Sequence, residues 1–184
     1  MNIFLRLKHW QLFGLLIGIP VIFLTVGMKI AISFEEMATV FMLTIILFFG
    51  VFYGWLYTLG VNLNKRLPGT VKMGLIKFKW FLFISVAFII YSHIFVYWFL
   101  EHIDLNPVIH TVISSDIMLL PQFFSVFCFF YGLYFNAKSL KAVLLQRPVT
   151  FSDYSEDFFF FWFFPIGVWI IQPRINEIFD DTLQ

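Results

Sequence analysis

Four long apolar runs constrain this chain more than any other feature of its sequence. They cover residues 12–32, 37–62, 78–100 and 117–136, and each can cross a hydrocarbon layer of about 30 Å as a helix. Only a helix satisfies its own backbone hydrogen bonds within one lipid-embedded segment. The chain is 61% hydrophobic and 12% charged, too apolar for a soluble domain. We therefore predict an all-α polytopic membrane bundle with four transmembrane helices, forming a single membrane domain over residues 1–184.

Positively charged side chains set the expected orientation. Eleven of the twelve Lys and Arg residues lie before the first run, from the end of the second run to the start of the third, or after the fourth run. Only Lys29 lies in a connection on the opposite side. Cytoplasmic connections carry such an excess of cations, so both termini are expected in the cytoplasm.

The last apolar stretch is too short for an ordinary span. We predict a broken hydrophobic helix over residues 151–171, followed by a polar tail over residues 172–184. The apolar part of this helix reaches only about 21 Å, and Pro165 and Gly167 disfavour a straight crossing. Two interpretations stay open: a re-entrant half-helix that turns at Pro165 and Gly167, or a kinked fifth span.

The connection to this segment also carries a pattern. Helical character continues beyond the fourth run as a cytoplasmic extension over residues 137–147, and Pro148 ends it. Thr150 and Asp153 have the spacing of a capping box, in which two side chains satisfy free amides at a helix start. A new helix is therefore expected to begin near Phe151.

The residues of this tail also carry a resemblance. The stretch that begins at Phe163, FFPIGVWIIQPRIN, and the TFSD stretch at Thr150 resemble the C-terminus of small uncharacterised multi-span membrane proteins of Gram-negative bacteria. The likeness is specific over the C-terminal stretch and general over the spans. It implies a location in the inner (plasma) membrane and no assigned activity.

Glycines in the first two runs have the spacing that lets helix backbones approach closely. The pairs are Gly14 with Gly18 and Gly50 with Gly54. We expect them to join the first two spans in a tight hairpin. A seam between two copies of the chain is the alternative.

One polar cluster on the outer side contains possible ligands of a divalent metal. Its members are His93, Glu101, His102, Asp104 and His110. Imidazoles and carboxylates bind zinc, but the spacing matches no known metal motif and the single cysteine excludes a Cys-based centre. The alternative is a hydrated loop, with His93 hydrogen-bonded between helices. No other cofactor is predicted.

A basic group on the cytoplasmic side can recognise lipid head groups. It consists of Lys65, Arg66, Lys138 and Lys141. Clustered cations at the membrane surface attract anionic lipids. The alternative is the ordinary interfacial belt of Tyr, Trp and Lys side chains.

Function is the least constrained property. We expect a non-enzymatic accessory or assembly subunit, with the lipid bilayer and other membrane proteins or further copies of the chain as partners. The net charge of +1 argues against nucleic acid as a partner. One alternative is a small oligomeric channel or transporter whose cavity is lined by the broken C-terminal segment. A further alternative is a membrane enzyme that uses the outward-facing His and carboxylate cluster.

Overall fold

The computed structural model describes residues 3–101 and 107–180, with side chains in these ranges except at 96 and 99–119. Every element in this part of the chain is helical, which confirms the predicted all-α class. The order is η1 (Ile3–Leu5), α1 (His9–Phe13), η2 (Gly14–Gly18), α2 (Ile19–Ile30), α3 (Phe34–Asn64), α4 (Leu75–Glu101), α5 (Pro107–Leu145), α6 (Phe151–Trp162) and α7 (Phe164–Asp180).

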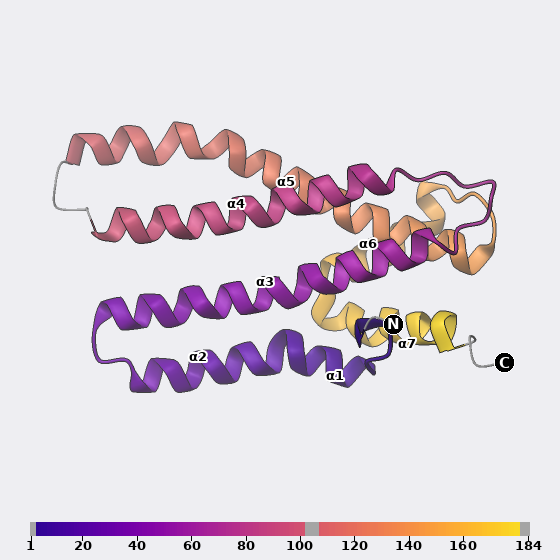
Figure 1. Cartoon of the computed structure of the whole chain (residues 1–184), viewed down its shortest axis with the longest axis horizontal. Coiled ribbons are helices and arrows are strands. Elements are labelled where there is room, and N and C mark those ends of the chain that lie inside the picture. The colour runs from indigo at the N-terminus through magenta and orange to yellow at the C-terminus, as the bar shows by residue number, and fades with distance from the viewer. Residues whose placement is uncertain (1–2, 102–106, 181–184) are drawn as a thin grey trace.

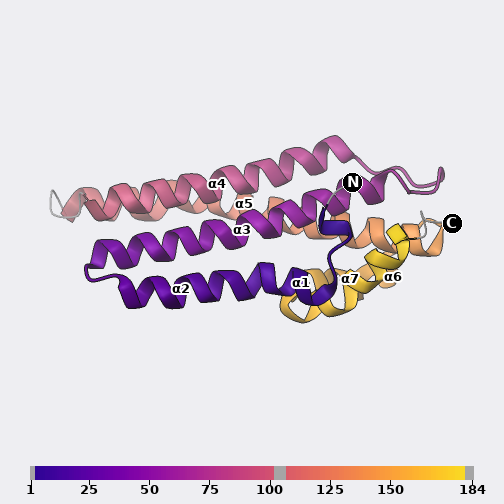
Figure 2. The ribbon, with the colours of Figure 1, turned by 60° about the horizontal axis from the view of Figure 1, so that its bottom comes forward.

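Two long antiparallel hairpins form the bundle (Figure 1). In one, η2 and α2 pack against α3, and in the other α4 packs against α5. The connection 31–33 lies at one end of the bundle, which we name the hairpin end. The opposite end, which we name the terminal end, carries η1, the connection 65–74 and the last turns of α7 (Figures 1 and 2).

Three described helical segments are long and apolar enough to cross a membrane: His9–Ile30, Phe34–Asn64 and Leu75–Phe95. They overlap the first three predicted spans, so the chain has the helices of a membrane protein. The fourth predicted span, 117–136, lies within α5, a continuous helix of 39 residues. Whether α5 crosses the membrane stays a prediction.

The predicted packing glycines do not bring helix backbones together. A Cβ added at Gly14, Gly18 or Gly50 would meet no atom within 4 Å. One added at Gly54 would meet a ring of the N-terminal segment, that of Phe4, at 3.3 Å, rather than a second helix. The expected tight hairpin through these glycines is therefore not what the structure shows, while a seam between two copies stays a prediction. Gly14 and Gly18 are the first and last residues of η2, a π-helical turn. Residues four apart in such a turn do not lie on one helix face, as they do in an α-helix.

The hairpin of α2 and α3 is instead closed near its connection. A Cβ on Gly27 would come within 2.5 Å of the Val40 side chain. The start of α3 is fixed by Ser33 and Glu36, whose hydroxyl and carboxylate accept hydrogen bonds from the amides of Glu36 and Ser33 at 3.1 and 3.2 Å. The short connection and this capping box hold the two helices together.

A second capping box begins α6. The Asp153 carboxylate accepts hydrogen bonds from the amide and hydroxyl of Thr150 at 2.8 and 2.9 Å. Arg147 also pairs with this carboxylate at 2.9 Å. The guanidinium and the two Thr150 groups lower the pKa of Asp153 to about 2. The carboxylate is therefore ionised at neutral pH, and α6 begins at Phe151, the residue that the capping pattern indicates.

The helices α6 and α7 form a short hairpin that runs into the bundle from the terminal end and returns to it (Figures 1 and 2). The chain reverses at Phe163. Its amide donates to the Phe159 carbonyl at 2.8 Å, and its carbonyl accepts from the amides of Ile166 and Gly167 at 3.1 and 2.9 Å. One residue thus ends α6 and begins α7 with its own backbone groups paired.

The position of this reversal corrects the sequence prediction, which placed it at Pro165 and Gly167. Pro165 is the second residue of α7, a position where the missing N–H is not needed and the fixed φ favours a helix start. Gly167 packs against α6, because a Cβ there would overlap the Phe160 carbonyl oxygen. The predicted polar tail is also helical as far as Asp180, and Gln172, Arg174 and Asn176 in it have protein partners.

The core lies at the terminal end, where α6 and α7 cover the other helices. Its fully buried side chains come from the N-terminal segment, α3, α4, α5 and the hairpin of α6 and α7, which we name the C-terminal hairpin. The largest are Leu12, Leu16, Trp55, Leu56, Leu59, Leu63, Phe78, Leu133, Phe135, Leu140, Phe161 and Ile171. The hairpin therefore completes the core.

Replacement of Gly167 by Ala tests this packing. The new methyl group overlaps the Phe160 carbonyl oxygen, so we expect α7 to shift away from α6. The unfolding free energy should fall by roughly 1–3 kcal/mol, as it does at other overpacked sites. Thermal unfolding in mild detergent measures the loss. Gly18→Ala is the matched control, because it adds the same methyl group in open space. Equal melting temperatures for both variants would contradict the close approach.

Candidate functional site

The proposed metal cluster is only partly described. His102, Asp104 and the side chains of Glu101 and His110 lie outside the described residues. Among those that are described, no three His, Cys, Asp or Glu side chains gather as a metal site. His93 makes a contact of 2.6 Å from Nδ1 to the Ile89 carbonyl oxygen of its own helix. The alternative expected a hydrogen bond between helices, and this contact lies within α4 instead.

Three of the four proposed head-group cations are engaged within the protein. Arg66 donates to the Ile178 carbonyl, and its guanidinium lies 4.4 Å from the Phe179 ring centroid. Lys138 donates to the Tyr134 hydroxyl at 3.0 Å, and this hydrogen bond raises the pKa of the lysine.

Lys141 pairs with Asp157 at 3.5 Å. The fourth cation, Lys65, is exposed. The four proposed head-group cations therefore do not form one free basic patch in the structure.

A buried carboxylate unites the C-terminal hairpin with α5. Asp157 is fully buried on α6, and its two oxygens face Arg174 of α7 at 2.6 Å and Lys141 of α5 at 3.5 Å. Burial raises the pKa of Asp157, and the two cations oppose that shift. A buried carboxylate needs such partners, because desolvation disfavours its charged form. Asp157 therefore fixes α6, α7 and α5 relative to one another.

Two amide side chains of α7 hold the N-terminal segment. Gln172 is fully buried and donates to the carbonyls of Phe4 and Leu7 at 2.9 and 2.8 Å, while its oxygen accepts from Trp55 Nε1 at 3.2 Å. One turn later, Asn176 donates to the carbonyls of Leu5 and Leu7 at 2.9 and 3.2 Å. The polar residues of the QPRIN stretch thus pair with backbone and carboxylate groups inside the protein.

These contacts were not predicted from the sequence. The signal that could have indicated them is the spacing of Gln172 and Asn176, which share one helical face, together with Asp157 at the start of an apolar run. We name the contacts of Asp157, Gln172, Arg174 and Asn176 the terminal clasp.

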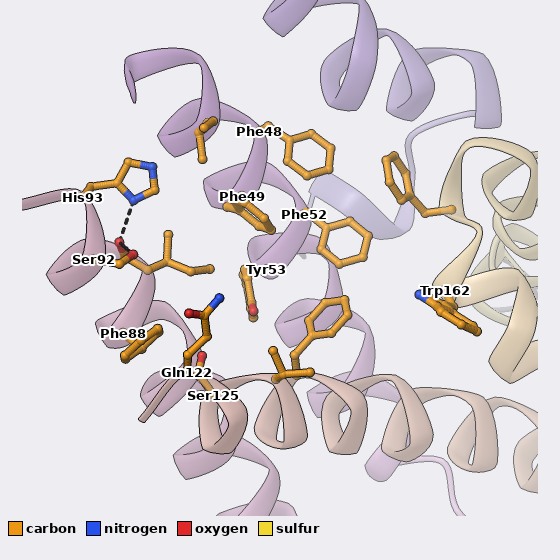
Figure 3. A pocket seen from close by; sticks show the side chains of 15 residues that line it. Phe48, Phe49, Phe52, Tyr53, Phe88, Ser92, His93, Gln122, Ser125 and Trp162 are labelled. Carbon is orange, nitrogen blue, oxygen red and sulfur yellow. Dashed lines mark hydrogen bonds between the residues drawn. The ribbon is translucent and has the colours of Figure 1, made fainter. Parts of the chain in front are cut away.

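A cavity of about 560 Å³ lies between the two long hairpins (Figure 3). Its walls come from α3, α4 and α5, and Trp162 and Phe164, on either side of the Phe163 break, close its base. Most of the lining is aromatic or aliphatic. Two of the lining residues on α5, Gln122 and Val126, are exposed, so the cavity is accessible from the protein surface.

Polar side chains occupy one part of this apolar cavity. They are Tyr53 of α3, Ser92 and His93 of α4, and Gln122 and Ser125 of α5. In Figure 3 the Gln122 amide reaches into the cavity, and the Tyr53 hydroxyl points toward it. The described lining contains no Asp, Glu, Lys or Arg side chain. The cavity is thus suited to an uncharged molecule with a small polar group.

A second cavity of about 460 Å³ lies on the other side of the contact between α3 and α4. Phe49, Tyr53 and Ile89 line both cavities and separate them. Gly50 lines the second cavity, and no atom lies within 4 Å of the place its Cβ would occupy. Gly50 therefore borders open space rather than the backbone of α2.

Comparison of the chain with protein-family models, with curated proteins and with solved structures found no match in any of the three. The resemblance of the C-terminal stretch to a bacterial membrane family therefore stays a prediction. The cavities and the terminal clasp are the observations from which a function can be argued.

Replacement of Asp157 by Asn tests the terminal clasp. Arg174 and Lys141 then lose their carboxylate, and we expect a loss of roughly 3 kcal/mol in unfolding free energy. This loss lies at the low end of the range for a broken buried ion pair, because Arg174 and Lys141 are both partly solvated. Denaturant unfolding in detergent measures it. Glu156→Gln removes a neighbouring exposed carboxylate and is the control. Equal unfolding free energies for the two variants would contradict a stabilising role of the terminal clasp.

Proposed function

We propose that this chain is a multi-pass membrane protein that binds a lipid-soluble molecule in the central cavity without catalysing a reaction. One observation carries the proposal: the 560 Å³ cavity is closed at its base by residues on both sides of the Phe163 break. Its volume lies within the range of sites for small organic ligands. The apolar walls and open rim favour a molecule that arrives from the bilayer.

The cavity supports binding better than conduction. The transporter interpretation expects a cavity lined by the broken C-terminal segment, and Trp162 and Phe164 of that segment line this cavity. A route across the membrane would also have to pass the terminal end. There Trp55, Leu56 and Phe161 are fully buried in the core.

We further propose that the terminal end faces the cytoplasm of a cell with an inner membrane, with four spans and a cytoplasmic N-terminus. The excess of Lys and Arg in the connections at this end supports that orientation. The hairpin of α6 and α7 then enters the bilayer from the cytoplasmic side and returns. Irregular backbone at membrane depth is tolerated where protein buries it or where it lines a cavity, and Phe163 lies between two cavity-lining residues.

Replacement of Ile45 by Trp tests the binding function. Ile45 lines the central cavity, and an indole there takes up space that a ligand needs. We expect the amount of lipid-soluble molecule retained by the purified protein to fall about tenfold or more. Native mass spectrometry from mild detergent measures retention.

Ile94→Trp is the matched control for this experiment. Ile94 is exposed on α4 and does not line the cavity, so the same substitution should leave retention unchanged. The binding function is wrong if the wild-type protein retains no such molecule, or if both variants retain as much as the wild type.

An accessory subunit of a membrane complex is the second candidate. The second cavity and the open space at Gly50 favour it, because small residues let a helix of another chain approach closely. In this case the partner is a transmembrane helix of another membrane protein or of a second copy.

Replacement of Gly50 by Leu tests that candidate. The larger side chain fills the second cavity, so we expect recovery of a copurifying partner to fall roughly tenfold. Quantitative mass spectrometry after affinity purification in mild detergent measures the recovery. Ala87→Leu, at an exposed site of α4 away from both cavities, is the control. Isolation of the wild-type chain alone, as a monomer, would remove the basis for this candidate.

A further inference from the structure

The second cavity follows one face of each of two antiparallel helices. Its α3 residues run from Ile46 to Tyr57 and its α4 residues run from Lys79 to Ile90, both at helical spacings of three and four. Each stretch rises about 16 Å along its helix. Because α3 and α4 are antiparallel (Figure 1), Tyr57 and Lys79 lie together toward the terminal end, and Ile46 and Ile90 lie at the opposite end of the cavity.

The length of the second cavity matches the depth of one membrane leaflet. A hydrocarbon layer of about 30 Å gives about 15 Å for each leaflet. Ile46, Phe83 and Ile90 line the cavity and are exposed, so its long side is open at the outer surface of α3 and α4. One acyl chain of a lipid can therefore lie along the whole cavity. A transmembrane helix of another chain would extend beyond it through the second leaflet.

The charge in this cavity is confined to its terminal end. Lys79 is the charged residue among the described lining, and the other lining residues are aliphatic, aromatic or glycine. Its ammonium lies 5.9 Å from the centroid of the Tyr57 ring, a cation–π distance. No carboxylate of the described residues pairs with this exposed lysine. An ammonium at the end of an apolar groove complements an anionic group on an apolar chain.

The position of Lys79 along α4 suits contact with a lipid head group. It lies about one turn after Leu75, the first residue of α4, and the exposed Trp80 follows it. Lys and Trp side chains concentrate at the membrane surface, where a long lysine side chain extends its ammonium toward the head groups. The charged end of the second cavity thus belongs at the membrane surface, and its apolar part extends toward the bilayer centre.

We propose that the second cavity binds one anionic phospholipid from the leaflet at the terminal end, with an acyl chain along α3 and α4 and its phosphate at Lys79. This site goes beyond the proposed function, because it requires the membrane location but no ligand in the central cavity. It assigns to a lipid the space in which the second candidate function places a partner helix. An apolar helix there would cover the Lys79 ammonium without supplying an anion.

The test compares two phospholipids that differ only in the head group. The purified full chain in mild detergent is titrated with dioleoylphosphatidylglycerol, which is anionic, and with dioleoylphosphatidylcholine, which is zwitterionic. Native mass spectrometry measures the affinity for the first lipid bound. We expect the anionic lipid to bind the wild-type protein about fivefold more tightly, the contribution of one lysine at a membrane surface.

Three variants locate the site. Lys79→Gln should bring the ratio between the two affinities close to one. Lys77→Gln is its matched control, because Lys77 is exposed on the same helix and lines neither cavity, and it should keep the wild-type ratio. Gly50→Leu places a side chain in the groove and should weaken binding of both lipids.

The outcomes separate this inference from the proposed function. Equal affinity of the two lipids for the wild-type protein overturns the inference, as does a preference that Lys79→Gln keeps or that Lys77→Gln also loses. Lipid affinities unchanged in Gly50→Leu, together with loss of a copurifying protein, would assign the groove to a partner helix instead. Ile45 lines only the central cavity, so Ile45→Trp should keep the head-group preference, and each proposal can fail without the other.

Discussion

Pairing of backbone polar groups in a solvent without water is the constraint on which the rest of this structure depends. It makes every described element helical, and it leaves few places where the chain can change direction. Phe163 is the place where the direction changes deep in the bundle, and its amide and carbonyl are both paired at that point. The reversal brings Gly167 onto the Phe160 carbonyl, so the hairpin is narrow enough to close the core and the base of the cavity.

The terminal clasp gives this hairpin a fixed position. Asp157 joins it to α5 through Lys141, and Gln172 joins it to Trp55 of α3 and to the N-terminal segment. Each partner is a group that would be costly to bury alone. The N-terminal residues, α3, α5 and the C-terminal hairpin thus meet through polar contacts at the terminal end. The hairpin of α2 and α3 depends at its other end on the short connection 31–33 and on the packing of Gly27 against Val40.

Sequence patterns that act locally were reliable guides to this fold. Long apolar runs predicted the long helices, and the spacing of Thr150 and Asp153 predicted the start of α6. Pro165 was misinterpreted because a proline can break a helix or begin one, and only the contact of Gly167 with α6 decides between these roles. The central cavity was out of reach of sequence analysis, because it arises where two hairpins separate. Its polar residues interrupt apolar runs in the sequence, but nothing in their spacing indicates that they line one cavity.

The place of the C-terminal hairpin in the chain has a consequence for biosynthesis. The helices α1 to α5 are made first, and at that stage Leu12, Leu16 and Trp55 lack the neighbours that α6 and α7 later provide. Membrane insertion and completion of the core are therefore separate events, divided by the time needed to synthesise the hairpin. A nascent chain interrupted before Phe151 would have its long helices but neither a clasp nor a cavity base. Such a chain would present an uncovered aromatic surface and would lack the donors that Gln172 and Asn176 give to the carbonyls of Phe4, Leu5 and Leu7. Cellular quality control can distinguish it from the finished protein by these features.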